Sequence, residues 1–261
     1  MRWLLVALLI GPLAADTPGN SAAPIYTAES IANTAANIAG YYAANTFLSI
    51  YGENLAFATR AIAPGDILNG LLPTALPGTS VRVLINLVPA HIYYVSPQQV
   101  NVLVPPSLGT GRATVQLIRD GVAGPAVAIT LGAAAPALFP LGATTVIATH
   151  ADGALVTESS PARRGETIVL YAGGLGPTVP AAVSGTLAQG AAQIANKNEF
   201  RVSLNGAAVE SRRVAYAGLT PGFAGLFQIN LQLPEDAPLN AEIRMGFPDL
   251  LSPAGRILLI R

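Results

Sequence analysis

A strand-like stretch of this chain occurs twice, and the repetition limits the available folds more than any other feature. Residues 98–105 read QQVNVLVP, and residues 227–234 read FQINLQLP. Two further blocks repeat in the same order, with FLSIYGENLA (47–56) matching TIVLYAGGLG (167–176) and VRVLIN (81–86) matching FRVSLN (200–205). The offset between copies is 120 residues for the first block, 119 for the second and 129 for the Gln-x-Asn strand. The sequence therefore predicts a duplicated domain with added residues in the second copy, which we expect within 217–226.

Each repeated block has the alternating pattern of a β-strand. In QVNVLV, Val100, Val102 and Val104 alternate with Gln99, Asn101 and Leu103, so the valines are predicted to face inward and the amides outward. QINLQL repeats this pattern in the second copy. A proline ends both strands, because proline cannot donate a hydrogen bond to the ladder.

Turn signals divide the rest of the chain into short strands. Asp-Gly pairs predict tight turns within 112–131 and within 147–158. The segment 29–40 has apolar residues at helical spacing, which predicts a short helix. The chain has 26 Gly, 21 Pro and 51% hydrophobic residues, which favours many short strands around a core. We expect an all-β fold of two tandem immunoglobulin-like β-sandwiches, joined near 133–142.

Four stretches carry a resemblance to a known family: IANTAANIAGYYAANTFLSIYGENLA, AHIYYVSPQQVNVLVPPSL, APALF and SSPARRGETIVLYAGGLGPT. They resemble the Solibacter-type uncharacterised C-terminal domain of secreted acidobacterial proteins, which is similar to IPT/TIG-like immunoglobulin folds. Where that family has Pro-Gly before its first strand, this chain has Ala44-Asn45 and Arg164-Gly165. The second copy also lacks the Ser-Pro of the family pattern. The resemblance implies two Ig-like domains and export, and it implies no activity.

The N-terminus has the pattern of a secretory signal peptide. A basic residue, an apolar run from Trp3 to Ile10 and small residues at Ala14 and Ala15 predict cleavage after Ala15. The alternative, a membrane anchor, would need about 20 apolar residues. The predicted organisation is a signal peptide at 1–15, a first sandwich at 24–139 and a second at 140–261. The mature chain, without a transmembrane segment, is expected to be secreted or to lie at the bacterial cell surface or in the periplasm.

Composition argues against several functional classes. Lys and Arg number 14 against 14 Asp and Glu, without a basic run, which argues against a nucleic-acid partner. The absence of Cys excludes thiol catalysis and thiolate metal sites. His91 and His150 are the two histidines, and no Gly-x-Ser-x-Gly elbow accompanies them. LYAGGLGPT (170–178) lacks the third glycine of a dinucleotide loop and is interpreted as a turn. The sequence thus predicts no catalytic residues, no metal site and no cofactor.

The candidate binding residues are Tyr93, Tyr94, Gln99 and Asn101. The tyrosines could stack on sugar rings while the amides bond sugar hydroxyls. The alternative is structural, because outward amides on a strand can pair with neighbours and specify register. Repetition of the amide pair in both copies favours the structural interpretation. We expect a non-catalytic adhesion, interaction or scaffold module whose partner is a protein or polysaccharide at the cell surface, or alternatively a carbohydrate-binding module.

Overall fold

The computed structural model describes residues 22–261, so the predicted signal peptide lies outside the described residues. Nearly all regular structure is β, and the helical segments are short 3₁₀ turns such as η1 (Pro64–Asp66). Among the described residues, the helices are too short to cross a membrane. The chain divides into two compact units. Unit 1 extends to Ala133 and also includes Val183–Leu187, and unit 2 comprises Ala134–Ala182 and Ala188–Arg261. This division differs from the predicted boundaries at 134–139 and at 183–187.

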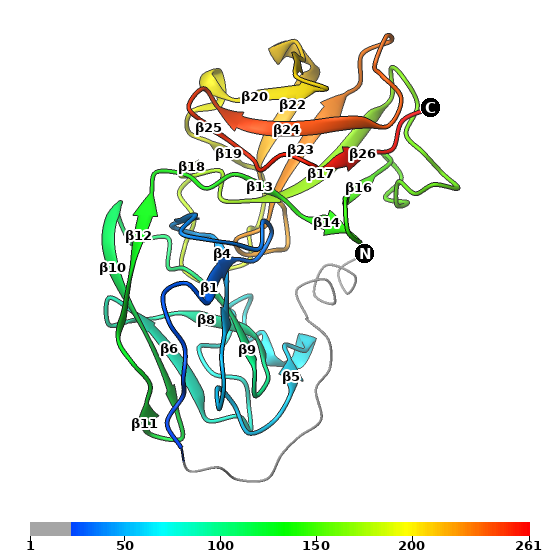
Figure 1. Cartoon of the computed structure of the whole chain (residues 1–261). Coiled ribbons are helices and arrows are strands. Elements are labelled where there is room, and N and C mark those ends of the chain that lie inside the picture. Colours follow the sequence, from blue (N-terminus) through cyan, green and yellow to red (C-terminus); the bar gives the residue numbers. More distant parts are fainter. Residues whose placement is uncertain (1–21) are drawn as a thin grey trace. The chain divides into compact units, whose positions relative to one another are not determined.

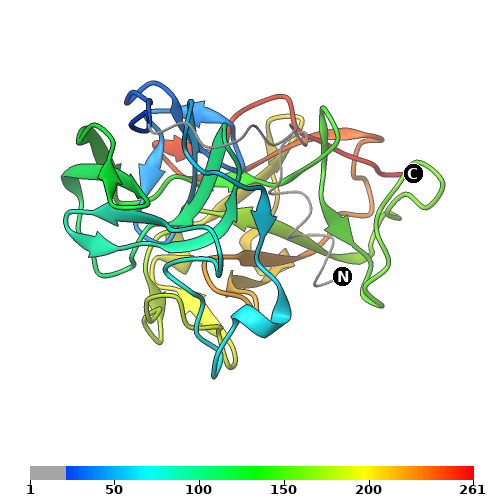
Figure 2. The same cartoon turned by 90° about the horizontal axis from the view of Figure 1, so that it is seen from below.

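Unit 1 consists of two sheets (Figures 1 and 2). One sheet has the order β2 (Ile38–Ala39), β1 (Ile31–Asn33), β4 (Phe47–Tyr51), β9 (Gln99–Leu103), β8 (His91–Val95) and β5 (Arg60–Ala61). The other has the order β3 (Tyr42–Ala43), β12 (Val127–Gly132), β10 (Gly111–Arg119), β6 (Val81–Ile85) and β7 (Val88–Pro89), with β11 (Val122–Ala123) beside β10.

This strand order is that of an immunoglobulin-like sandwich. Strands β1, β4, β9 and β8 take the places of A, B, E and D, and β6, β10 and β12 take those of C, F and G. Strand β3 runs parallel to β12, whereas the other pairs in the unit are antiparallel. The first strand region is therefore shared between the two sheets, as expected for this fold.

Unit 2 repeats the arrangement with different labels. Its first sheet has the order β13 (Ala137–Leu138), β17 (Thr167–Gly173), β23 (Phe227–Gln232), β22 (Val214–Leu219), β19 (Ala192–Ile194) and β18 (Thr178–Val179), and β16 (Ala148–Thr149) also pairs with β17. Its second sheet has the order β14 (Pro140–Leu141), β15 (Thr145–Val146), β26 (Ile257–Leu258), β24 (Ala241–Phe247), β20 (Arg201–Leu204) and β21 (Ala207–Ala208), with β25 (Leu250–Leu251) beside β24. The predicted all-β, Ig-like fold is confirmed.

The two units match at the level of strand register. Ile50 pairs with Val100 in unit 1, and the corresponding Leu170 pairs with Ile229 in unit 2. The turn after strand C matches as well. Asn86 and Asn205 both have a left-handed φ, of 50° and 48°, and the side-chain oxygen of each accepts a backbone N–H of strand F at 2.8 Å. The repeated sequence blocks therefore specify the same strands, B, C and E, in each unit.

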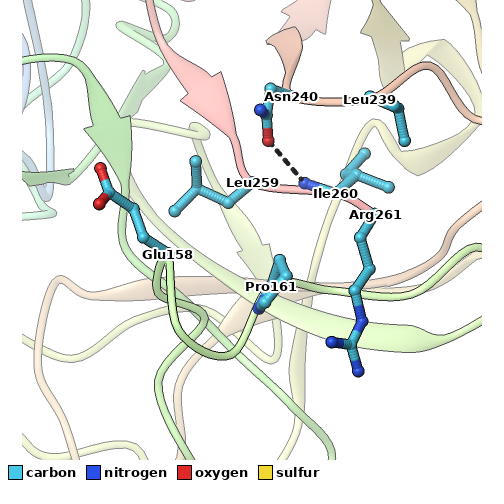
Figure 3. Close-up of a pocket in the computed structure, with 7 residues that line it drawn as sticks. All are labelled: Glu158, Pro161, Leu239, Asn240, Leu259, Ile260 and Arg261. Carbon is cyan, nitrogen blue, oxygen red and sulfur yellow. Dashed lines mark hydrogen bonds between the residues drawn. The ribbon is translucent and has the colours of Figure 1, made fainter.

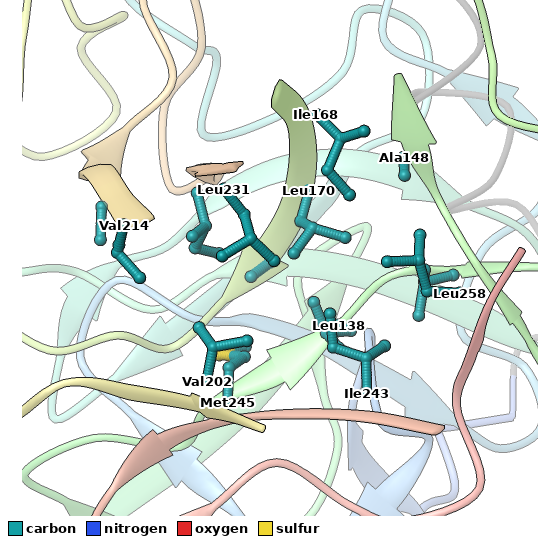
Figure 4. Packing of buried hydrophobic residues seen from close by; sticks show 14 of the residues in the cluster. Leu138, Ala148, Ile168, Leu170, Val202, Val214, Leu231, Ile243, Met245 and Leu258 are labelled. Atoms are coloured by element: carbon teal, nitrogen blue, oxygen red, sulfur yellow. The ribbon is translucent and has the colours of Figure 1, made fainter. Parts of the chain in front are cut away.

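Each unit buries its own apolar side chains between its sheets. In unit 2, Ile168, Leu170 and Leu231 of one sheet face Val202, Ile243 and Met245 of the other (Figure 4). The cluster continues with Leu138, Val214 and Leu258, all buried. At roughly 25 cal/mol per Å² of apolar surface removed from water, such a layer is the main term that stabilises a sandwich.

The short helix predicted for 29–40 is wrong, because the segment forms two strands around a turn. The side-chain oxygen of Asn33 accepts the N–H groups of Ala35 and Ala36 at 3.0 and 3.3 Å, and Asn37 adopts a φ of 54°. An asparagine that bonds the following backbone in this way favours a turn over a helix. The turn at Asp120-Gly121 is confirmed, with φ values of 49° and 79° and antiparallel strands on either side.

Candidate functional site

The four residues predicted to bind a ligand lie in neighbouring strands β8 and β9, and all four are buried. Tyr93 and Tyr94 are 6% and 2% exposed, and Gln99 and Asn101 are 8% and 0% exposed. Tyr93 lies in a bulge of β8, and its ring packs edge-on against Phe47 with centroids 4.7 Å apart. Burial raises the pKa of the Tyr93 hydroxyl. None of these side chains presents a face to solvent, so their role in binding stays a prediction.

The amides of the repeated strand bond to each other. Gln99 Nε2 donates to Asn101 Oδ1 at 2.9 Å, and Gln228 Nε2 donates to Asn230 Oδ1 at 3.0 Å in unit 2. The predicted outward face of β9 is therefore not a solvated face in unit 1, because side chains on both sides of this strand are buried. A buried amide must find partners, and here each amide supplies the other with one.

His91 belongs to the interior of unit 1. Its Nδ1 donates to the carbonyl oxygen of Leu72 at 2.7 Å, and its Nε2 lies 3.3 Å from Ser184 Oγ. Burial lowers the pKa of His91, and the bond to Leu72 opposes that effect. Since both ring nitrogens have partners that suit the neutral ring, we assign His91 a structural role in holding the segment 183–187.

His150 lies in unit 2 with a serine and a glutamate. Its Nδ1 is 2.5 Å from Glu166 Oε1, and its Nε2 is 3.2 Å from Ser160 Oγ. A Ser–His–carboxylate arrangement is the arrangement used by serine hydrolases. Here, however, Nε2 also lies 3.1 Å from the backbone carbonyl oxygen of Ser160. A carbonyl oxygen can only accept a hydrogen bond, so this contact favours an Nε2 that carries a proton. A protonated Nε2 cannot accept the proton of the Ser160 hydroxyl.

Both ring nitrogens of His150 lie against acceptors, Glu166 and the Ser160 carbonyl oxygen, an arrangement that suits a ring donating from both nitrogens. The hydrogen bond to Glu166 is the largest effect that raises the pKa of His150, which favours the doubly protonated ring. The loop held at Ser160 is closed by a reciprocal pair of backbone bonds between Thr157 and Ser160, at 3.0 and 3.1 Å. Glu166 also accepts the backbone N–H of Arg163 at 2.8 Å. This cluster fixes the wall of a cleft.

The cleft beside this cluster has a volume of about 640 Å³. That size falls within the usual range for small-molecule sites, about 300–1,000 Å³. The lining residues come from the hairpin after β16, the loop before β17 and the chain end: His150, Ala151, Asp152, Ala154, Ser160, Pro161, Arg163, Arg164, Glu166 and Arg261.

A second hollow, of about 510 Å³, shares Pro161 and Arg261 with the first. Leu239 and Leu259 contribute apolar atoms to this second hollow, and Asn240 accepts the backbone N–H of Ile260 at 3.3 Å (Figure 3). We name the two together the unit 2 groove.

Sequence reasoning did not find the unit 2 groove. Arg163 and Arg164 are visible as an adjacent pair, but Arg261 is distant in sequence. What brings them together is a parallel bridge between Ala162 and Ile260, which a sequence pattern does not indicate. Within residues 22–261, no group of three His, Asp or Glu side chains is arranged to hold a metal ion.

No family model and no curated protein matches the chain. Among solved structures, the chain is similar to the surface glycan-binding protein PbSGBP-B of Prevotella bryantii, with 12% identity, a TM-score of 0.27, and coverage of 90% of this chain and 42% of that chain. It is also similar to the I9–I11 tandem of titin, with 9% identity, a TM-score of 0.25, and coverage of 84% and 61%. The N-terminal Ig1–2 module of Drosophila Dlar has 12% identity, a TM-score of 0.22, and coverage of 92% and 97%.

The chain spans less than half the length of the Prevotella protein. Similarities at this low identity and low superposition assign neither a function nor a partner to this chain.

Proposed function

We propose that this chain is an exported, non-catalytic protein of two Ig-like units that serves as an interaction or scaffold module at the bacterial cell surface. The observation that carries the proposal is the repetition of one sandwich in both units, down to the pairing of Ile50 with Val100 and of Leu170 with Ile229. The most strongly repeated residues, the Gln-x-Asn pairs, are used in side-chain bonding within the sheet.

The histidine cluster supports the non-catalytic part of the proposal. His150 Nε2 lies 3.1 Å from the Ser160 carbonyl oxygen, an acceptor that favours a protonated Nε2 over one that takes a proton from the serine. Ser160 instead belongs to a tight loop that forms a groove wall. Loops on a rigid sandwich are the usual positions for partner binding.

A carbohydrate-binding module is the second candidate, and the unit 2 groove favours it. The groove offers backbone and side-chain polar groups beside apolar atoms of Pro161 and Leu259, a combination that suits a sugar ring. This position differs from the predicted one at Tyr93 and Tyr94, whose rings are buried. Membership of the Solibacter-type family and cleavage after Ala15 belong to the same proposal.

The test begins with secretion of the full chain from a bacterial host. We expect the mature protein to start at Asp16, which mass spectrometry of the secreted product would establish. The mature chain, 16–261, would then be applied to an array of bacterial and plant polysaccharides and to envelope fractions. Saturable binding to one class supports the proposal. Retention of the uncleaved chain in the cytoplasm would contradict it.

Enzymatic activity would also contradict the proposal. The mature chain would be assayed on a panel of ester, amide and glycoside substrates, with Ser160→Ala and His150→Gln as paired variants. We expect no turnover by any of the three proteins. Turnover by the parent chain that both variants abolish would show that the cluster is a hydrolase site.

A further inference from the structure

Three arginines converge on the unit 2 groove because of one local strand pairing. Ala162 forms a parallel bridge with Ile260, and its N–H donates to the Leu259 carbonyl oxygen at 3.0 Å. The N–H of Arg261 in turn donates to the Ala162 carbonyl oxygen at 2.9 Å. This ladder places Arg261 beside Arg163, and all three arginines line the same cleft.

The guanidinium groups of this cleft are available to a ligand. Within residues 22–261, neither Arg163, Arg164 nor Arg261 forms an ion pair within 4.0 Å. Arg163 and Arg261 are exposed, and Arg164 uses its Nε to donate to the Ala237 carbonyl oxygen at 2.8 Å. The outer N–H groups of each fork therefore face the cleft or solvent.

The two carboxylates that line the cleft are already occupied. Glu166 accepts from His150 and from the backbone of Arg163. Asp152 accepts the backbone N–H of Ala154 at 2.9 Å. In the first hollow three arginines stand against two engaged carboxylates, which leaves an excess of positive charge there, although the chain as a whole has no net formal charge. Glu158 is the acidic side chain of the second hollow, so the excess is confined to the first. An anionic ligand would complement that excess.

We propose that the unit 2 groove binds an acidic polysaccharide through its uronate carboxylates, an inference that rests on the proposed function and names its ligand class. The planar guanidinium group of arginine donates two parallel hydrogen bonds to a carboxylate, and each uronate ring of an acidic polysaccharide carries one carboxylate. Arg163 and Arg261 are the residues that bind the carboxylates. Pro161, Leu239 and Leu259 line the second hollow (Figure 3), where their apolar atoms would pack against the C–H face of the next ring.

The geometry favours a sugar chain over a peptide. An extended peptide is commonly bound by adding a strand to an open sheet edge. At this groove the backbone groups are already paired, since Ala162 bonds to Leu259 and Arg261, and Ile260 bonds to Asn240. An oligosaccharide is instead bound by side-chain hydrogen-bond donors on a shallow surface. Two adjoining hollows that share Pro161 and Arg261 offer room for more than one ring.

The experiment compares one polymer with and without its charge. Binding of the mature chain to polygalacturonate oligomers and to their fully methyl-esterified form would be measured by calorimetry. We expect saturable binding to the acid form and binding at least about tenfold weaker to the ester, because the ester lacks the charge that the guanidinium groups bind. Binding should also weaken as the salt concentration rises, because salt screens the exposed guanidinium groups.

Variants locate the site. Arg163→Gln with Arg261→Gln should weaken acid binding by about tenfold or more. The matched control is Arg82→Gln with Arg112→Gln, which removes equal charge from exposed positions on β6 and β10 of unit 1. Unchanged thermal unfolding of both double variants would show that they are folded.

Three results would overturn the inference. They are equal affinity for the acid and the ester, equal loss of binding in both double variants, and absence of binding to the acid form. In the last case, retained binding to a neutral polysaccharide or an envelope protein would leave the proposed function standing. Failure of every polysaccharide and envelope ligand would count against both.

Discussion

At the scale of single residues, Asn101 and Asn230 occupy the same place in the two units but differ in exposure. Asn101 is fully buried, whereas Asn230 is partly exposed. We expect Asn101→Ala to destabilise unit 1 by about 1–3 kcal/mol, because it removes the acceptor of Gln99 in a buried setting. Asn230→Ala should cost less, because water can replace the lost partner.

Thermal unfolding of both variants would measure this difference. A loss at Asn230 equal to that at Asn101 would contradict the assignment of the amide pair as a buried structural feature. Binding of a sugar by the Asn101 variant with parent affinity would remove β9 from any ligand site.

The two histidines are expected to titrate on opposite sides of 6.5, their ordinary pKa. The hydrogen bond to Glu166 raises the pKa of His150, and burial lowers the pKa of His91. For His150, the stabilisation is complete below the unfolded pKa and is lost as pH rises through the folded value. For His91 the sign is opposite, because its neutral form is favoured on folding and acid removes that stabilisation.

Proton NMR of the imidazole rings can follow both groups, since the chain has two histidines. Glu166→Gln should return the pKa of His150 toward 6.5 without moving that of His91. A lower pKa for His150 than for His91 would show that the hydrogen bond between His150 and Glu166 is absent in solution.

At the scale of elements, the turn after strand B uses the same backbone shape in both units with different residues. Asn54 has a φ of 58° and the corresponding Gly174 has a φ of 71°. A Cβ on Gly174 would lie 2.1 Å from the backbone oxygen of Ala135, within unit 2. Glycine is needed for both shape and space at position 174, and residues 174–177 of LYAGGLGPT connect strand β17 to strand β18.

This turn provides a paired test. Gly174→Ala should destabilise unit 2 by more than about 1 kcal/mol, because a side chain is strained at this φ and clashes with backbone. Asn54→Gly should change stability by less than about 1 kcal/mol, because glycine adopts the same shape freely. Urea unfolding of each variant would compare them, and a neutral Gly174→Ala would contradict the described turn.

How far the sequence predicts each element depends on the range of the interactions that form it. Strands B, C and E can be predicted from the local alternation of apolar and polar residues. The turns at Asn86 and Asn205 are also local, because asparagine tolerates the left-handed φ that both residues adopt. The segment 29–40 departs from its predicted helix because apolar spacing carries no information on the hydrogen bonds that Asn33 accepts from Ala35 and Ala36. The unit 2 groove could not be predicted, because it depends on Ala162 and Ile260 meeting through the fold.

At the scale of the whole molecule, unit 1 is not a continuous piece of chain. Its residues 183–187 come from beyond strand β18. Within unit 1, the Leu72 N–H donates to the Gly185 carbonyl oxygen at 2.9 Å, and the Leu187 N–H donates to that of Gly70 at 2.8 Å. Gly185 also lies so close to the His91 ring that an added Cβ would be 2.2 Å from it.

A fragment that ends at Ala133 should therefore be less stable than unit 1 in the full chain. We expect faster amide exchange at Leu72 in the fragment, because its acceptor at Gly185 is missing. The full chain with Gly185→Ala is the comparison, since the added methyl group would meet the His91 ring. Parent-like protection of Leu72 in the fragment would show that 183–187 contributes little.

The discontinuity of unit 1 also sets an order of events during biosynthesis. Every strand of unit 1 has been made once the growing chain passes Gly132, but the partner of Leu72 appears only when Gly185 emerges. Completion of the earlier unit therefore waits for much of the later one. A chain that stalls or is cleaved between Gly132 and Gly185 has a unit 1 in which Leu72 and His91 lack their partners from 183–187. We expect proteases and chaperones to act on such a chain at this site.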